Sequence, residues 1–194
     1  MPRTSRTFIG IPVPKARSIK LQRLQTLIAP EVPTVRWTPF EQFHLTLGFL
    51  GDVDQRDLTE VCRTVSEVCA PFDPFGLSIM GLGVFPDLAK PRVLWAGLEG
   101  EGLATLFALR EAINEAMIAI DYAPDPKFHA HLTLGRVKLN RDTETDLSPL
   151  LRHFQTWNGG QFEVSEVITF GSDLSAEGST HTAFSTAPLL GTRK

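Results

Sequence analysis

Apolar residues along this chain follow two spacings, one typical of strands and the other typical of helices. Alternating apolar and polar residues, or short apolar runs bounded by turn residues, predict strands. Apolar positions three and four residues apart predict helices. The predicted strands are 7–13, 44–50, 75–80, 93–98, 131–135, 162–170 and 182–185, the predicted helices are 15–28, 54–69, 102–120 and 143–153, and the Gly- and Pro-containing stretch 81–91 is predicted to be a loop.

Strands and helices alternate through both halves of the chain, and no low-complexity linker separates the halves. Short loops between the elements favour an α+β fold, with two antiparallel sheets that carry helices on their outer faces. Each half contains one copy of the same pentapeptide, which indicates an internal duplication. We therefore expect residues 1–194 to form a single domain of two interleaved, pseudo-symmetric lobes, whose open sheet faces meet at a central cleft.

The repeated pentapeptide is HLTLG, at residues 44–48 and again at 131–135. Side chains in a strand point alternately to opposite faces. Each copy therefore presents its histidine and threonine on one face, and its two leucines anchor the other face in a core. If rough twofold symmetry relates the lobes, both polar faces line one groove, and two imidazoles lie on opposite sides of one small ligand.

Two opposed histidines suit in-line displacement at phosphorus. One neutral ring can take a proton from the attacking oxygen while the other, protonated, gives a proton to the leaving oxygen. Both forms are available near neutral pH because the ordinary pKa of histidine is about 6.5. His44 and His131 are thus the catalytic candidates, and the hydroxyl groups of Thr46 and Thr133 are candidate donors to the nonbridging phosphate oxygens.

Arg136 adds a positive charge directly after the second copy. It lies an odd number of residues from His131, so a regular strand would point its side chain away from the groove. A bulge or twist at Gly135 would turn the side chain back toward the phosphate.

Charge and composition limit the ligands that the chain can hold. Its formal net charge is -3 and its pI is about 5.9, so no broad cationic field is available for a long polyphosphate backbone. We expect it to grip one end or one nucleotide of a nucleic acid. Cys62 and Cys69 are the only cysteines, and their helical spacing predicts packing. The absence of a membrane-spanning apolar run in the sequence predicts a soluble cytoplasmic protein.

A metal site is an alternative use of the second motif. His129 and His131 share a face and would need His153 to complete a ligand set. No clustered Asp, Glu or Cys accompanies them, and the repeated threonines would then be unexplained, so we expect no metal. His153, at the end of a predicted helix, is more simply a solvated residue that favours the helix dipole.

The whole chain resembles the 2H phosphoesterase superfamily, which is named for its two His-x-Thr-x motifs. Within it, the chain is similar to the RNA 2′,3′-cyclic phosphodiesterase family, historically called 2′-5′ RNA ligase. The likeness extends beyond the motifs to the segments FIGIPVP, VRWTPFEQFHLTLGFLGDV, GLGVFPDLAKPRVLWAGL, KFHAHLTLGRV and SDLSAEGSTHTAF.

The resemblance implies a bilobal fold and the hydrolysis of an RNA-terminal 2′,3′-cyclic phosphate to a 2′-phosphomonoester, without metal or cofactor. By position, His44 would protonate the departing 3′ oxygen, His131 would activate water, and Thr46, Thr133 and Arg136 would bind the phosphate. Ligation of 2′-5′ linked ends is the same chemistry in reverse. The resemblance also implies a monomeric protein. Its expected partners are 2′,3′-cyclic nucleotides or RNA with a 2′,3′-cyclic phosphate terminus, tRNA fragments included.

Additional substrate contacts are expected from residues beside the motifs. Phe43 and Phe128 precede the two motifs and would stack a base if core packing does not take them. His129 is expected in the groove wall. His181 stands where relatives often have tyrosine, and it is expected either as a ligand contact or as a half-exposed strand histidine.

Two further departures from the family's pattern lie close to the motifs. Ala130 stands where relatives commonly have proline, and Gly48 stands where they often have a basic residue. Together with His181, these departures motivate an alternative function, in which the chain is an RNA-end or nucleotide binding module with weak or no catalysis.

Overall fold

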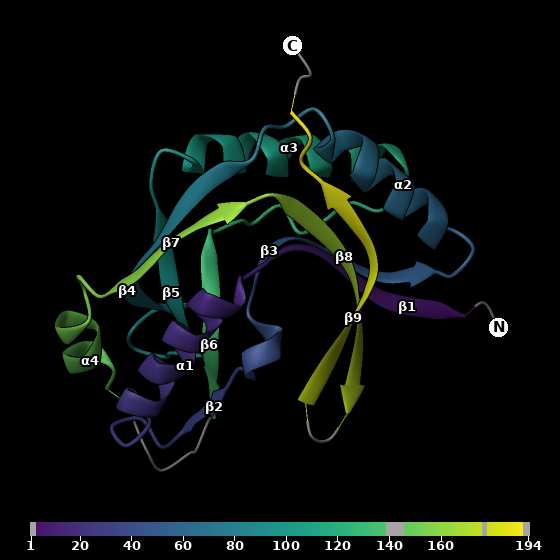
Figure 1. Ribbon diagram of the computed structural model, residues 1–194. Coiled ribbons are helices and arrows are strands. Elements are labelled where there is room, and N and C mark those ends of the chain that lie inside the picture. Colours follow the sequence, from purple (N-terminus) through teal and green to yellow (C-terminus); the bar gives the residue numbers. More distant parts are fainter. Residues whose placement is uncertain (1–2, 139–145, 176–177, 192–194) are drawn as a thin grey trace.

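The computed structural model describes residues 3–138, 146–175 and 178–191. Within these residues the chain forms strands, four α-helices and one short 3₁₀ helix, η1 (Figure 1). In chain order they are β1 (Thr4–Pro12), α1 (Lys15–Ile28), β2 (Val35–Trp37), η1 (Phe40–Gln42), β3 (His44–Asp54), α2 (Leu58–Cys69), β4 (Phe75–Phe85), β5 (Val93–Glu99), α3 (Leu103–Ala119), β6 (His131–Val137), α4 (Ser148–His153), β7 (Asn158–Val164), β8 (Glu166–Ser175) and β9 (Gly178–Pro188).

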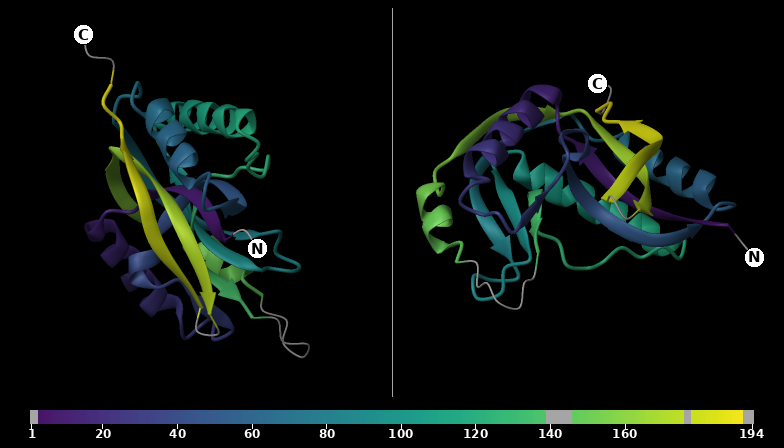
Figure 2. Two further views of the ribbon diagram at one scale, coloured as in Figure 1. Left: turned by 90° about the vertical axis from the view of Figure 1, so that its right-hand side faces the viewer. Right: turned by 90° about the horizontal axis from the view of Figure 1, so that it is seen from below.

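The strands form two antiparallel sheets. One has four strands in the order β3-β1-β8-β9, and the other has five in the order β2-β6-β5-β4-β7. Figure 1 shows the four-stranded sheet strongly curled, with α2 and α3 packed side by side across its outer side. Both views of Figure 2 show β8 and β9 running together as a long twisted pair. The predicted α+β fold class, with two antiparallel sheets, is confirmed.

The helices form where the apolar spacing predicted them. In α3, Leu106, Leu109, Ile113 and Met117 recur at intervals of three and four residues, and all are buried. The boundaries of α1 agree with the predicted helix 15–28, and Pro14 directly precedes its first turn.

The leucines of both HLTLG copies lie in one hydrophobic core. Leu45, Leu47, Leu132 and Leu134 are at most 3% exposed, whereas the motif histidines and threonines are half-buried. Full burial of each leucine side chain stabilises the fold by roughly 1.5–3 kcal/mol. The alternation predicted for the pentapeptide is therefore present in both copies.

The single strand predicted for residues 162–170 is wrong. Two strands occupy this region, because β7 ends at Val164 in the five-stranded sheet and β8 begins at Glu166 in the four-stranded sheet. Ser165 lies between them, and its carbonyl accepts a hydrogen bond from Leu189 N. Two consecutive polar residues, Ser165 and Glu166, break the apolar alternation where the chain crosses between sheets.

The loop predicted for 81–91 is also wrong in its first part, because β4 continues to Phe85. Its two glycines are accommodated within the strand. Gly81 has a φ of 64° and lies at a bulge between Met80 and Leu82, and Gly83 faces Trp95 across the pair with β5. Glycine in this strand marks a bulge and a close approach, not a strand end.

Three smaller differences concern element boundaries. Strand β3 extends to Asp54, so α2 begins at Leu58 and not at the predicted residue 54. Strand β2 and helix η1 were not predicted, because each spans only three residues. The predicted helix 143–153 begins outside the described residues, and α4 covers Ser148–His153.

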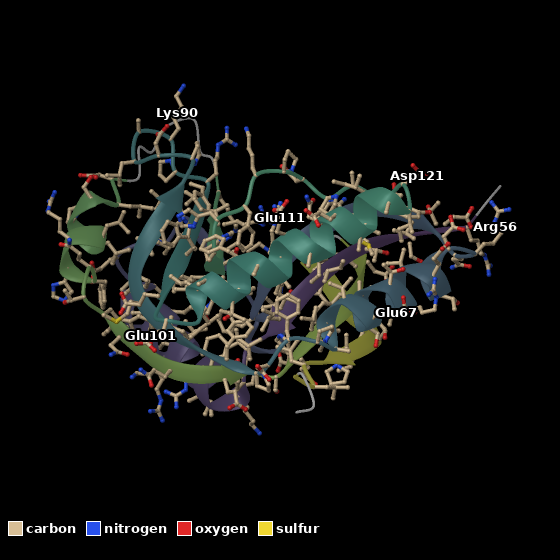
Figure 3. All side chains as sticks on the ribbon, turned by 90° about the horizontal axis from the view of Figure 1, so that it is seen from above. Arg56, Glu67, Lys90, Glu101, Glu111 and Asp121 are labelled. Carbon is tan, nitrogen blue, oxygen red and sulfur yellow. The ribbon has the colours of Figure 1, made fainter. Side chains whose placement is uncertain are left out.

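Among the described residues, Arg110 is a buried charged residue, and many other charged side chains lie on the outside of the molecule. Figure 3 shows Arg56, Lys90 and Glu101 at its periphery. In the part of the chain that the structure describes, no helix is long and apolar enough to cross a membrane.

Candidate active site

The two HLTLG copies lie in different sheets and still meet. Strand β3 is an edge strand of the four-stranded sheet, β6 belongs to the five-stranded sheet, and the two strands contact each other. We call the sheet face that carries the motif histidine and threonine the motif face. Strand β1 pairs with β3 and carries Phe8 and Gly10 on its motif face. Strand β5 pairs with β6 and carries Trp95 and Gly97 on its motif face.

His44 is held by a main-chain hydrogen bond and packed by aromatic rings. Its Nδ1 lies 2.7 Å from the carbonyl oxygen of Gln42, and its ring centroid lies 4.8 Å from Phe8 and 5.1 Å from His181. Burial lowers the pKa of His44 to about 4, while the Gln42 carbonyl opposes this change and the charges of His181 and His131 add to it. His44 and His131 are the first residues of β3 and β6, and these two strands contact each other.

His131 has a matching environment in the other sheet. Its Nδ1 lies 2.7 Å from the carbonyl oxygen of His129, and its ring centroid lies 4.9 Å from Phe85. Burial lowers the pKa of His131, the His129 carbonyl opposes the change, and the charges of His129 and Arg136 lower the pKa further.

Both main-chain contacts select the same tautomer. A carbonyl oxygen accepts hydrogen bonds and donates none, so Nδ1 of each ring must carry the hydrogen. In each neutral ring, Nε2 is then the atom with a free lone pair. His44 and His131 can therefore each take up a proton at Nε2 and release it there, as opposed acid and base catalysis requires.

Each motif strand contains a β-bulge at the second leucine of its pentapeptide. Gly10 pairs with Thr46 and Ile9 with Gly48, so Leu47 has no direct partner. In the same way Trp95 pairs with Thr133 and Leu94 with Gly135, which leaves Leu134 without a direct partner. The same irregularity thus occurs at corresponding positions of both copies.

The bulges change which side chains reach the motif faces. Arg136 pairs with Val93, which shares a face with Trp95, so the bulge returns Arg136 to the motif face, as required of a phosphate ligand. Arg36 on β2 pairs directly with Arg136 and lies on the same face. At the corresponding position of β3, Phe49 pairs with Phe8 and is 38% exposed on its motif face.

Several aromatic residues of the site were not found by sequence reasoning. Phe8 and Phe170 stack with centroids 4.9 Å apart beside His44, and Phe85 and Trp95 lie 5.1 Å apart beside His131. They come from strands that pair with the motif strands, or from the next strand along. They reach the histidines only because strands that are far apart in the sequence pair with one another in a particular register.

Phe43 packs in the core and also borders the cavity beside His44, and Phe128 is half-buried against neighbouring side chains. Phe43 is 4% exposed in the core, and Phe128 packs against Phe107 and the guanidinium of Arg110. Both residues lie outside the strands that carry the motifs, since β3 begins at His44 and β6 at His131, so strand alternation does not decide where their rings point.

The remaining expected contacts lie beside the motif histidines. His181 on β9 neighbours His44, and the exposed ring of His129 lies 6.1 Å from that of His131. Gly48 is buried, and a Cβ there would lie 3.0 Å from Pro124, which leaves no room for a longer side chain without rearrangement. Ala130 is 9% exposed and packs in the core.

The metal site considered for His129, His131 and His153 is not assembled. No group of three His, Cys, Asp or Glu side chains among the described residues lies close enough to hold a metal ion. His153 is exposed at the end of α4, against Phe154. Cys69 is fully buried, and burial raises its pKa to about 12, as suits a packing role.

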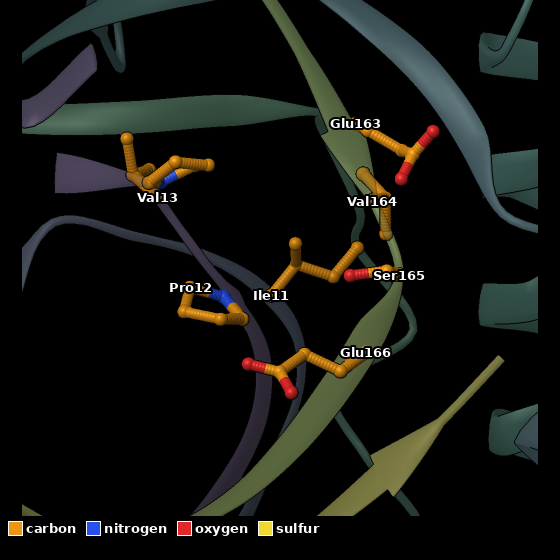
Figure 4. A pocket seen from close by; sticks show the side chains of 8 residues that line it. Ile11, Pro12, Val13, Glu163, Val164, Ser165 and Glu166 are labelled. Atoms are coloured by element: carbon orange, nitrogen blue, oxygen red, sulfur yellow. The ribbon is translucent and has the colours of Figure 1, made fainter. Parts of the chain in front are cut away.

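Two cavities lie near the crossing between the sheets. One, of about 370 Å³, opens beside His44 and His181 and extends to Lys15, Glu41 and Gln42; we call it the His44 pocket. The other, of about 240 Å³, lies between residues 11–14 and 163–166 (Figure 4). The second cavity contains none of the site residues expected from the sequence.

Known proteins match most of this chain. The family described as LigT like Phosphoesterase matches the chain twice, over residues 11–95 and 97–180. A curated RNA 2′,3′-cyclic phosphodiesterase of Aquifex aeolicus is 32% identical over 91% of this chain and 93% of its own length, and one of Methanothermobacter thermautotrophicus is 29% identical over 91% and 95%. Among solved structures, TT0787 of Thermus thermophilus matches with a TM-score of 0.81 at 24% identity over 97% of this chain and 100% of that chain. Escherichia coli LigT complexed with 3′-AMP matches with a TM-score of 0.76 at 20% identity over 96% and 99%.

Proposed function

Because the chain belongs to the LigT-like phosphoesterase family, we propose that it hydrolyses the 2′,3′-cyclic phosphate at an RNA end to a 2′-phosphomonoester. Its curated relatives carry the name RNA 2′,3′-cyclic phosphodiesterase and match most of their length. The observation that carries the proposal is the pair of motif histidines, each with Nδ1 bound to a main-chain carbonyl and Nε2 left for catalysis.

The reaction divides between the two imidazoles. Neutral His131 accepts a proton at Nε2 from the attacking water, and protonated His44 donates one from Nε2 to the departing 3′ oxygen. The bond from phosphorus to O3′ breaks as the bond to the water oxygen forms, and the phosphate stays on O2′. In the free protein both rings are mainly neutral at pH 7, because the pKa of His44 is about 4 and that of His131 is lowered. An anionic cyclic phosphate between the rings favours protonation of His44.

The phosphate and the base are held by different groups. Thr46 and Thr133 donate hydroxyl hydrogen bonds to the nonbridging oxygens, and Arg136 neutralises the charge that moves onto them in the transition state. Phe49 replaces Phe43 and Phe128 as the stacking surface in this proposal, because its ring is 38% exposed on the motif face. The Arg6 guanidinium lies over this ring, 4.8 Å from its centroid, so the base would stack on the part that Arg6 leaves open.

Turnover of a nucleoside 2′,3′-cyclic phosphate, with phosphorus NMR identifying the product, tests the proposal. We expect the purified protein to form the 2′-phosphomonoester. His44→Ala and His131→Ala should each lower turnover by about 10²–10⁴-fold while circular dichroism shows an unchanged fold. His153→Ala is the matched control, because this histidine is exposed on α4 away from the motif strands.

Two outcomes would contradict the mechanism. Parental turnover in both motif variants would remove the histidines from the chemistry. Binding of a 2′-nucleotide without hydrolysis at any pH between 5 and 8 would instead identify the RNA-end binding module.

The proposal includes how the chain is organised. We infer that residues 1–194 form one domain of two interleaved lobes related by pseudo-symmetry, each contributing one motif. The matching bulges, the matching histidine contacts and a hydrophobic core that includes residues of both motif strands support this inference. In this proposal the protein acts as a cytoplasmic monomer on cyclic phosphate ends of RNA, with tRNA fragments among the candidate substrates.

A further inference from the structure

The His44 pocket lies next to the reacting groups and is not used by the proposed reaction. His44, His181 and Phe170 form its wall on the motif face. Lys15, the first residue of α1, and Glu41 and Gln42 of η1 line the rest. The pocket therefore combines one ammonium group, one carboxylate, a carboxamide and aromatic surface in a volume of about 370 Å³.

The order of residues along β3 gives the bound ribose a direction. Thr46 and then Phe49 follow His44 along β3 on the motif face, and Gln42, the last residue of η1, precedes His44. A strand advances about 3.3 Å per residue, so these side chains form a row that is longer than one nucleoside. The His44 pocket lies at the Gln42 end of the row, and the partly exposed ring of Phe49, with the Arg6 guanidinium over it, lies at the other.

The stereochemistry of a 2′,3′-cyclic nucleotide fits this row in one orientation. The carbon that bears O2′ is bonded to C1′, which carries the base. The carbon that bears O3′ is bonded to C4′, which carries C5′ and the rest of the RNA chain. If His44 protonates O3′ and the base lies toward Phe49, then C5′ points toward the His44 pocket.

We propose that the His44 pocket binds the phosphate attached to C5′ of the terminal ribose and the nucleoside that follows it upstream. This inference rests on the proposed function, since the direction depends on His44 facing O3′. The ammonium group of Lys15 pairs with the 5′ phosphate, and Phe40 and Phe170 supply apolar surface for the upstream nucleoside. The carboxylate of Glu41 opposes the phosphate charge and confines the phosphate to the side of Lys15.

Three substrates separate the pocket from the reacting centre. They are adenosine 2′,3′-cyclic phosphate with a free 5′ hydroxyl, the same nucleotide with a 5′ phosphate, and an adenosine dinucleotide that ends in the cyclic phosphate. We expect the wild-type protein to prefer the second and third over the first. In Lys15→Ala, the ratio of kcat/KM between the second and first substrates should fall about five- to tenfold, the effect of one charge-assisted contact.

Two further variants sharpen the test. Glu41→Gln should raise the same ratio, because it removes a negative charge that repels the 5′ phosphate. Lys20→Ala is the matched control, since Lys20 lies on the same helix but lines a different surface hollow with Trp157. It removes the same charge and should leave the ratio within about twofold. Higher salt should shrink the preference of the wild-type protein and have less effect in Lys15→Ala.

The failure of this inference can be distinguished from failure of the proposed function. An equal loss on all three substrates in Lys15→Ala, or no change in the ratio, would overturn the pocket assignment while turnover of the cyclic nucleotide stands. If the wild-type protein turns over none of them, calorimetry with adenosine 2′-monophosphate and adenosine 2′,5′-bisphosphate decides the question by binding. Equal affinity for the two, or a preference that survives Lys15→Ala, would also overturn it.

Discussion

Mild acid should destabilise this fold through His44. Burial and its neighbours lower the pKa of His44 from 6.5 to about 4 in the folded protein. Between these two values the unfolded chain binds a proton that the folded chain does not. The free energy of unfolding therefore falls as the pH falls through this range, because the extra proton favours the unfolded state.

The size of the effect follows from the same two values. One pKa unit corresponds to about 1.36 kcal/mol, so the complete effect has a ceiling of about 3 kcal/mol, and about 2 kcal/mol of it develops between pH 7 and pH 5. His131 and His181 add a contribution of the same sign, since burial lowers their pKa as well. The carboxylates with lowered pKa, Asp54 and Asp146, lose their contribution only at more acidic pH.

Urea unfolding at pH 7, 6 and 5 measures this effect in the wild-type protein and in His44→Gln. The variant lacks the titrating ring, so its loss of stability from pH 7 to pH 5 should be smaller by about 2 kcal/mol. Constant m-values would show that the denatured state is comparable across the series. His153→Gln, at an exposed position, is the control. If His44→Gln and the wild-type protein lose the same free energy over this range, the reasoning about the burial of His44 is refuted.

Four other substitutions test the packing of the site. Leu132→Ala should lower the free energy of unfolding, measured by chemical denaturation, by about 2–5 kcal/mol because Leu132 is fully buried. Thr133→Ala should change it by less than about 1 kcal/mol and should lower turnover. Gly83→Ala places a methyl group against the ring of Trp95, so we expect a lower melting temperature and a shifted tryptophan emission, and an unchanged emission would contradict the close approach. Gln42→Ala removes the hydrogen bond that the Gln42 side chain donates to the Ser179 carbonyl, which joins η1 to β9. Because the Gln42 carbonyl holds His44, kcat should fall more than KM rises. A parental kcat would show that this contact does not position His44.

The sequence determined the parts of the site that depend on local alternation. Leu45 and Leu132 are buried while His44 and His131 are half-buried, because a strand with period two permits no other distribution once one face is in the core. The helices could be predicted because apolar residues three and four positions apart are also a local pattern. Arg136 was predicted to need a bulge at Gly135, and a bulge is present at the preceding residue, Leu134.

What the sequence did not predict depends on pairing between distant strands. Phe8 and Phe170 reach His44 only through the register of β1 with β3 and β8, which no local pattern specifies. The crossing of the chain from one sheet to the other at Ser165 has the same origin. Base stacking by Phe43 or Phe128 stays a prediction, although Phe43 is 4% exposed in the core and Phe128 packs against Phe107.

The duplicated strand supplies the same chemistry twice, and the surroundings of the two copies make them different. At the corresponding position after each motif, β3 carries the neutral ring of Phe49 and β6 carries the permanent charge of Arg136. Burial is the main cause of the lowered pKa of His131, and the charges of His129 and Arg136 lower it further. The low pKa of His44 has burial as its main cause, with smaller contributions from other histidines, which carry no permanent charge. The charge of a bound phosphate opposes that effect directly. We propose that this difference favours His131 as the base and leaves the acid role to His44, whose pKa a bound phosphate must raise from about 4.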